Sequence, residues 1–384
     1  MKKVGKKTLW ALVATLMAAL MLAGCGGSGG EEDKQAGPGE EEKFKVAFVY
    51  ITSAGDAGWT YAHDLGRLYL QDQLDWVDAS EIVENVPENP ADAEQVITQL
   101  AEQGNKVIFT TSFGYMDPTI NVAQKYPDVT FVHCSGYKTA DNVGAYFGRM
   151  YQARYLSGLV AGQATESNII GYVGAHPIPE VIRGINAFTV GVRAANPDAV
   201  VKVVWTNSWF DPTVEKQSAE VLLDAGADVI AQHMDSPAPQ QAAEERGKLG
   251  IGYNSDMRAQ APGAVMTSPM WEWGPYYVET VQAIKDGTFD PTPTAGSLTY
   301  WGGLKEGLVK ISDYGPMVPE ETKQLVEQEK ARIISGEWDV FYGPLKDQNG
   351  EVKVAEGQKM TDDEMLAMDW FVEGVEGKIT APQF

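Results

Sequence analysis

Residues 44–70 read FKVAFVYITSAGDAGWTYAHDLGRLYL, and this stretch decides the fold class. It opens with a continuous apolar run, Val46 to Tyr50, passes through a loop that contains Gly55 and Gly58, and continues as a helical segment to Leu70. A short unbroken apolar run predicts a strand that is buried on both faces. A strand followed by a glycine-bearing loop and a helix is typical of a parallel α/β sheet.

The same order of elements recurs along the chain. We expect further strands at 106–110, 129–133, 169–173, 200–205, 228–231 and 250–253, with helices at 91–103, 118–126, 151–163, 180–195, 214–225 and 239–248. One series ends near Phe147 and a second series follows it. Two such series in one chain predict two doubly wound α/β lobes. Turn signals at Tyr342-Gly343-Pro344 and Asn349-Gly350 predict a hairpin that caps one lobe.

The N-terminal segment is typical of an export signal. Four lysines precede an apolar run from Thr8 to Leu22, and Ala23-Gly24 stand before Cys25. A basic start, a short apolar run and small residues at the cut predict a secretory signal peptide over residues 1–24. The alternative is an ordinary signal peptide with an incidental cysteine. Residues 25–44 are glycine-rich and then acidic, which predicts a flexible linker.

The charge balance excludes one class of partner. The full chain carries 30 basic and 53 acidic residues, a formal net charge of −23, and loss of the predicted signal removes four lysines and leaves about −27. Nucleic-acid binding needs clustered basic side chains, so we expect no nucleic-acid partner. After processing, Cys134 is the one cysteine of the folded part, and its apolar neighbours predict a buried thiol.

No catalytic motif has the structural context that it needs. The Gly-x-Gly-x-x-Gly match at 24–29 and the Gly-x-Ser-x-Gly match at 26–30 both lie at the cleavage site and linker, without a preceding strand. The four histidines, His63, His133, His176 and His233, are far apart in the sequence. We therefore expect no enzyme activity, no metal and no cofactor.

Residues that follow the predicted strands are the candidates for a binding site, because ligands of doubly wound sheets lie beyond the carboxyl ends of the strands. The candidate ligand-binding residues, collected from these loops, are Trp59, Phe113, Tyr115, Asp117, Trp209, Asp235, Asp256 and Trp271. Aromatic faces and carboxylate edges suit a flat, polar, uncharged ring. Four of them have a structural alternative: Trp59 and Trp209 can be core residues, Asp117 can cap the helix at Pro118, and Asp256 can close a turn.

At these residues the chain resembles the basic membrane protein (PnrA-like) family, substrate-binding lipoproteins of ABC importers. The segments that carry the resemblance, which extends from Lys45 to about Trp338, include GDAGW at 55–59, GYMD at 114–117, NSWFDP at 207–212, GADVI at 226–230 and YNSD at 253–256. The resemblance implies a type I periplasmic-binding-protein fold, with two α/β lobes joined by a three-strand hinge. We expect the first lobe to comprise residues 45–148 plus about 271–298, and the second 149–270 plus about 299–384.

The resemblance also implies roles for individual residues. Trp59 and Trp209 fall at aromatic positions of the two lobes, Asp117 at the carboxylate that meets the edge of a base, and Asp256 at the acid that meets the ribose in nucleoside binders. Separately, Ala23-Gly24-Cys25 resembles the lipobox of bacterial lipoproteins, which implies cleavage before Cys25 and a lipid on it that holds the protein at the outer face of the cell membrane. The expected partners are a small-molecule purine and a permease with its ATPase, and we expect a monomer.

One departure from the family bears on the ligand. Where nucleoside binders have Ser-x-x-Lys, this chain reads Ser268-Pro269-Met270-Trp271, so a cation that reaches the sugar is replaced by an indole. We therefore expect a free purine base such as adenine rather than a nucleoside, delivered to the permease by hinge closure. The alternatives are a purine nucleoside binder, a ligand-sensing subunit for a membrane receptor, an extracellular nucleoside-cleaving enzyme, and a sugar or autoinducer binder.

Overall fold

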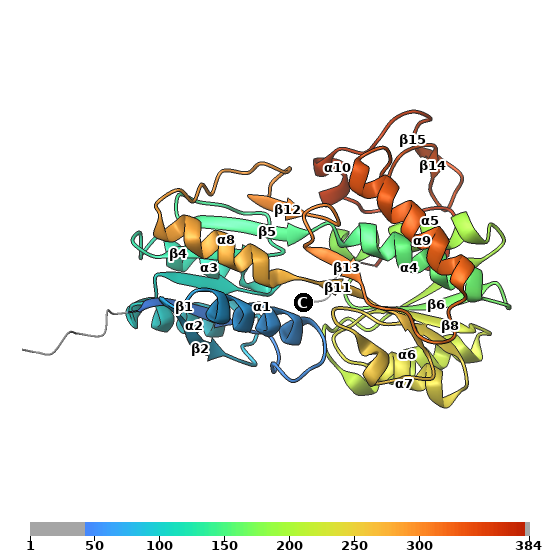
Figure 1. Cartoon of the computed structure of the whole chain (residues 1–384), viewed down its shortest axis with the longest axis horizontal. Helices are drawn as coiled ribbons and strands as arrows, with labels where there is room; N and C mark the ends of the chain where they lie inside the picture. The colour runs from blue at the N-terminus through green and yellow to red at the C-terminus, as the bar shows by residue number, and fades with distance from the viewer. Residues whose placement is uncertain (1–42, 381–384) are drawn as a thin grey trace, which may run out of the picture. The chain divides into compact units, whose positions relative to one another are not determined.

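The computed structural model describes residues 43–380, and these contain two parallel six-stranded sheets (Figure 1). The predicted signal peptide, Cys25 and nearly all of the predicted linker lie outside the described residues. Within the described part, no helix is both long enough and apolar enough to span a bilayer.

The first sheet has the strand order β12-β5-β4-β3-β1-β2. Its strands are β1 (Phe44–Val49), β2 (Val77–Val83), β3 (Val107–Thr110), β4 (Thr130–Cys134), β5 (Val143–Gly148) and β12 (Tyr300–Gly302), and all neighbours run parallel. Alternate residues of β1 face opposite cores, because Val46 and Phe48 pack with α1 (Trp59–Gln73) and α8 (Trp273–Lys285). Ala47 and Val49 instead pack with α2 (Pro90–Glu102) and α3 (Met116–Ala123).

The second sheet repeats this arrangement with the order β10-β9-β8-β6-β7-β16. Its strands are β6 (Ile169–Gly174), β7 (Val200–Trp205), β8 (Val229–His233), β9 (Leu249–Ile251), β10 (Val265–Thr267) and β16 (Val375–Glu376), again all parallel. Its helices are α4 (Met150–Ala164) and α5 (Pro179–Ala195) on one face, and α6 (Pro212–Asp224) and α7 (Ala238–Glu245) on the other.

The prediction of two doubly wound lobes is confirmed, and each sheet has the same internal topology. The chain starts in the middle, at β1 or β6, moves one strand to one side, and then returns past its start to the other side. The crevice for a ligand lies at this reversal, next to the first and third strands of each sheet.

The chain passes between the two sheets three times: after β5, between β10 and β12, and after β12. The second and third passages contain β11 (Pro269–Trp271) and β13 (Val309–Ile311), which pair antiparallel with each other. Strand β12 pairs with β5, so residues 300–302 lie in the first sheet, although the sequence placed residues from about 299 in the second lobe. A boundary of the proposed lobes therefore belongs after Gly302.

The C-terminal part packs on the second sheet. Helix α9 (Glu320–Ser335) contacts α4, and the predicted hairpin is present as β14 (Leu345–Lys346) and β15 (Val352–Val354). The short helix α10 (Asp362–Leu366) is fixed by a capping box between Thr361 and Glu364. Strand β16 then adds to the edge of the second sheet beside β7.

Helices α4 and α5 pack so closely that they require glycine on both sides. A Cβ atom at Gly191 would lie far inside contact distance of the carbonyl oxygen of Tyr155, and one at Gly158 would meet the carbonyl oxygen of Phe188 in the same way. Backbone atoms cannot rotate away as side chains do, so a methyl group here must separate the two helices.

We therefore predict that Gly191→Ala lowers the free energy of unfolding by about 1–3 kcal/mol, measured by urea denaturation, because it overpacks this contact. Gly184→Ala in the same helix is the matched control: the nearest atom to its Cβ would be His233 Nδ1 at 3.6 Å. It should leave stability unchanged or raise it by up to about 1 kcal/mol through helix propensity. Equal effects of the two changes would contradict the proposed contact.

Candidate ligand-binding site

The carboxyl ends of both sheets meet around one cavity with an empty volume of about 330 Å³. It is lined by residues that follow β1, β3 and β4 in the first sheet and β6, β7, β8 and β9 in the second: Ile51, Trp59, Ser112, Phe113, Ser135, Glu180, Trp209, His233, Asp235 and Tyr253. Its position at the strand reversal of both sheets is the position expected for a ligand.

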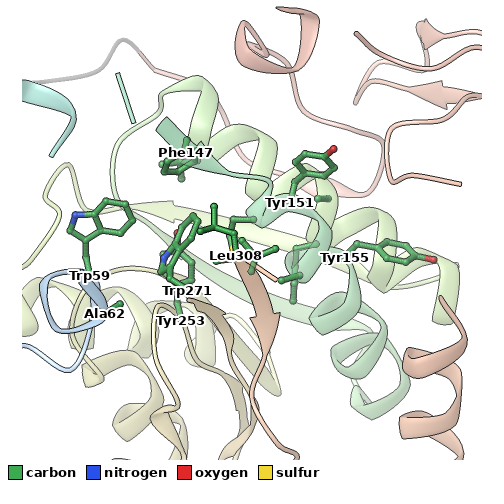
Figure 2. Close-up of a cluster of buried hydrophobic side chains, with 14 of the residues drawn as sticks. Trp59, Ala62, Phe147, Tyr151, Tyr155, Tyr253, Trp271 and Leu308 are labelled. Atoms are coloured by element: carbon green, nitrogen blue, oxygen red, sulfur yellow. The ribbon is translucent and has the colours of Figure 1, made fainter. Parts of the chain in front are cut away.

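Trp59 is held rigidly at the first residue of α1. Its indole nitrogen donates a hydrogen bond to the carbonyl oxygen of Thr111 at 2.6 Å. Its ring stands nearly perpendicular to Trp271 and Trp273, which stack on each other with centroids 4.6 Å apart. Figure 2 shows Trp59 and Trp271 among buried side chains such as Phe147 and Tyr253, which come from different sheets. This packing fixes the plane of Trp59 before any ligand binds.

The two sheets touch directly at the cavity. Gly58 lies against the backbone of Asp235, so that a Cβ atom at Gly58 would overlap the carbonyl group of Asp235. Next to this contact, Ser255 Oγ donates a hydrogen bond to the carbonyl oxygen of Ala57. The indole nitrogen of Trp209 donates to Glu88 Oε2 at 3.2 Å. The structure therefore represents the closed arrangement of the two sheets.

Unusual backbone conformations gather at this edge of the sheets. Ala57, Ser135, Asn207 and Asn254 are four of the six non-glycine residues with positive φ among the described residues. All four lie in loops that follow strands of the two sheets. Such conformations cost free energy, and they are found preferentially where a site is built.

Two acids face the cavity: Asp235, which is buried, and Glu180, whose side chain is 14% exposed. Burial raises the pKa of Asp235 well above its ordinary value, and the neighbouring carboxylates of Asp56 and Glu215 raise it further. Asn254 Nδ2 donates to Asp235 Oδ1 at 3.0 Å. Burial also raises the pKa of Glu180 to about 7, although Arg183 and Arg154 act in the opposite direction. A carboxyl group with a raised pKa can supply an O–H donor as well as acceptors over a wider pH range than an exposed acid.

His233 completes the polar side of the cavity. Burial lowers the pKa of His233 well below its ordinary value, and the nearby Arg154 and Arg183 lower it further, so its imidazole is neutral. Its Nε2 lies 3.5 Å from Glu180 Oε1 and 3.3 Å from the hydroxyl oxygen of Tyr253. A neutral imidazole suits an uncharged, polar ligand, because it can donate or accept a hydrogen bond without bringing a charge into the cavity.

The structure brings four of the eight predicted site residues into the cavity wall: Trp59, Phe113, Trp209 and Asp235. Trp271 lies behind the wall, packed against Trp59. Its indole nitrogen donates to Asn254 Oδ1 at 2.9 Å, and Asn254 in turn holds Asp235. Trp271 thus positions an acid of the cavity through a single intermediate side chain.

The other three predicted residues lie outside this cavity. Tyr115 points into the core between the first sheet and α2, where its hydroxyl donates to the carbonyl oxygen of Val86. Asp117 lies in the first turn of α3, with its side chain 60% exposed and ion-paired with Lys138. It lines an outer groove together with Trp209 and Glu88. Asp256 caps a short 3₁₀ helix (η2, Met257–Ala259) and forms an ion pair with Arg258.

The sequence analysis did not select six residues of the cavity wall, namely Ile51, Ser112, Ser135, Glu180, His233 and Tyr253. Each lies at or just after the end of a strand, or at the start of the helix that follows it, so position alone was the available signal. Among the described residues, no group of His, Cys, Asp and Glu side chains could hold a metal ion.

Two parallel α/β lobes with a cavity at facing strand ends define the periplasmic-binding-protein fold. Solved structures support this fold. A solute-binding protein of an ABC transporter system from Aeropyrum pernix aligns with a TM-score of 0.64 and 22% identity over 79% of this chain and 93% of that one. A transcriptional activator of the comK gene from Bacillus halodurans aligns with a TM-score of 0.65 and 21% identity, over 77% and 99%. These similarities establish the fold alone.

Sequence comparison then identifies the family. Residues 43–342 match the model of the PnrA-like ABC transporter substrate-binding proteins, so the chain belongs to this family. A purine-binding protein of Brucella abortus is 48% identical over 88% of this chain and 95% of its own length. A putative ABC transporter glucose-binding protein of Haloferax volcanii is 41% identical over 89% and 83%. The chain is therefore an extracytoplasmic solute-binding protein, not an enzyme, and it works with a permease.

The raised pKa of Glu180 predicts that this residue lowers the free energy of unfolding as the pH rises. Between pH 4.5 and about 7 the native state holds a proton on Glu180 that the unfolded state has lost, so this residue lowers stability as the pH rises. Glu180→Gln mimics the protonated form. The difference in free energy of unfolding between this variant and the wild type should therefore change in favour of the variant, by up to about 3 kcal/mol, from pH 4.5 to pH 7.5.

The measurement is urea denaturation of ligand-stripped protein at both pH values. Glu356→Gln is the matched control, because Glu356 is exposed on the surface of the tail. Its free energy of unfolding should equal that of the wild type at both pH values. A stability difference between Glu180→Gln and the wild type that does not change with pH would contradict a buried, protonated Glu180.

Proposed function

We propose that this protein captures a free purine base, adenine or a close relative, and delivers it to an ABC permease by opening and closing of its two lobes. One observation carries the proposal: Trp59 and Trp209 come from different sheets and line one small cavity, whose wall also contains two acids with raised pKa values and a neutral histidine. Aromatic faces bind flat rings by stacking, and acids and imidazole pair with the nitrogen atoms at the edges.

The residue at the position of the family's lysine favours a free base over a nucleoside as the ligand. Trp271 occupies that position and is almost fully buried. Its indole nitrogen donates a hydrogen bond to Asn254 Oδ1. The side chain is therefore committed to positioning Asp235 and offers no cation for a ribose. The 48% identity to a protein named as purine-binding supports the same ligand class.

A sugar is the competing ligand, because one relative is named as glucose-binding. The lining of the cavity favours the purine: Trp59, Phe113, Trp209 and Tyr253 supply four aromatic rings around about 330 Å³ of empty volume. A sugar presents hydroxyl groups over most of its surface and would need more charged and amide partners than this wall supplies.

Calorimetric titration of ligand-stripped protein with adenine, hypoxanthine, guanine, adenosine, guanosine and glucose tests the proposal. We expect at least one free base to bind more tightly than every nucleoside and than glucose. Adenosine binding much more tightly than every free base would contradict the choice of a base, and tight glucose binding without purine binding would contradict the ligand class.

Substitutions at the two indoles sharpen this test. Trp59→Ala should weaken binding of the preferred base by roughly 5- to 150-fold, the range that one base–aromatic stack contributes. Trp209→Phe keeps a ring but removes the hydrogen bond to Glu88, so its loss should be smaller. Asp117→Ala is the control at the rim. A loss of affinity as large as that caused by Trp59→Ala would show that Asp117 contacts the ligand directly.

We further propose that a lipid on Cys25 anchors the protein at the outer face of the cell membrane as a monomer. The Ala23-Gly24-Cys25 sequence after a basic and apolar start supports the lipid anchor. Cys25→Ala should release the full-length protein from the membrane fraction of the expressing cells, as followed by immunoblotting. A variant that stays in the membrane fraction to the same extent as the wild type would contradict anchoring through Cys25.

A further inference from the structure

A second and larger recess adjoins the ligand-binding cavity. Its empty volume is about 820 Å³, against about 330 Å³ for the cavity itself. The two spaces share three wall residues, Phe113, Ser135 and Glu180, so they are neighbours with a common boundary. A ligand held between Trp59 and Trp209 would therefore lie next to unfilled space.

We propose that this recess is a subsite for an apolar substituent carried by the bound purine. The inference rests on the proposed function and names a ligand class within it: purines that bear a hydrophobic side group. It concerns a space that binding of an unsubstituted base does not use.

The lining of the recess is mainly apolar. Its large apolar side chains are Phe113, Tyr137, Phe147, Ile178, Leu298 and Leu366. Phe147 also packs against Trp271 with ring centroids 5.2 Å apart, and Trp271 packs against Trp59. The aromatic cluster that supports the cavity therefore continues into the recess, and an apolar group placed there would leave water for hydrocarbon and ring surfaces.

The polar groups of the recess do not favour an anionic substituent. Arg183 Nη1 donates to the carbonyl oxygen of Met365 at 2.8 Å, which ties its guanidinium to the tail. Glu180 and Asp363 add two acids to the same wall. A phosphate would meet these acids, whereas an alkyl or aryl group meets the apolar side chains.

The far wall of the recess comes from the C-terminal tail, beyond residue 342, where the match to the family model ends. Asp363, Leu366 and Ala367 supply this wall. The tail is fixed there by paired hydrogen bonds, both 2.8 Å long, from the guanidinium of Arg149 to the carboxylate of Asp362. Such a two-point pair holds α10 in a defined orientation. The tail thus provides a firm wall for the recess.

The test compares adenine with N6-benzyladenine and 9-benzyladenine by calorimetry on ligand-stripped protein. Only a benzyl group on the ring position that faces the recess can enter it. One of the two benzyl compounds should therefore bind at least about tenfold more tightly than adenine, the scale expected for burial of an apolar side group. Ser297→Trp adds a large side chain to the recess and should weaken that compound at least tenfold while adenine changes less than twofold.

Ala367→Trp, in the wall that the tail supplies, is a second variant that should give the same pattern if Ser297→Trp fails to fold. Ser335→Trp at the exposed end of α9 is the matched control and should alter neither ligand. Adenine binding with rejection of both benzyl compounds would overturn the subsite and leave the proposed function intact. So would a preferred benzyl compound whose affinity neither filled variant changes. Failure of every purine to bind would instead overturn the proposed function.

Discussion

The absence of a side chain at Gly58 is the constraint on which the binding site depends. Because Gly58 has no Cβ, the loop after β1 lies directly on the backbone of Asp235, which follows β8 in the other sheet. The next residue, Trp59, is thereby brought to the same cavity as Asp235 and Glu180. Ser255 and Trp209 strengthen the contact with hydrogen bonds to Ala57 and Glu88. One close backbone approach thus joins two half-sites into a closed cavity.

Electrostatics then determines what the closed cavity can hold. An ionised carboxylate without a partner is costly in a closed, largely apolar space, and burial keeps the acids of this site protonated to higher pH. The histidine beside them is neutral for the same reason. Raised acid pKa values and a neutral imidazole reduce the charge on these three side chains, whereas the whole chain carries a formal charge of −23. Net charge describes the surface of this protein and says little about its ligand.

Much of the fold could be predicted from the sequence, because buried strands and amphipathic helices leave strong local patterns. Strand β2 was missed: its sequence VDASEIV contains Asp78, Ser80 and Glu81, as an edge strand with exposed positions allows. Strand β12 was assigned to the wrong side of a lobe boundary for a different reason. Its pairing with β5 joins residues about 150 positions apart, and no local pattern records such a pairing.

The site was predicted less completely than the fold. Selection of residues at strand ends identified the right loops. Four residues from these loops line the cavity: Trp59, Phe113, Trp209 and Asp235. This selection could not say which way each side chain points within its loop. The short 3₁₀ helix η1 (Phe113–Tyr115) directs Phe113 into the cavity and Tyr115 into the core, while Asp117 reaches the rim. Glu180 was overlooked because it belongs to the start of a helix, and only the three-dimensional structure places it between the cavity and the recess.

The central claim is that a flat purine ring is enclosed between Trp59 and Trp209. A crystal structure of the protein purified without removal of bound ligand tests it most directly, with mass spectrometry of the released small molecule from the same sample. The account predicts planar density between the two indoles, with ring nitrogens facing Asp235 or Glu180, and the mass of a purine base. Density for a sugar in that cavity, or a purine bound in the outer groove beside Asp117, would contradict it.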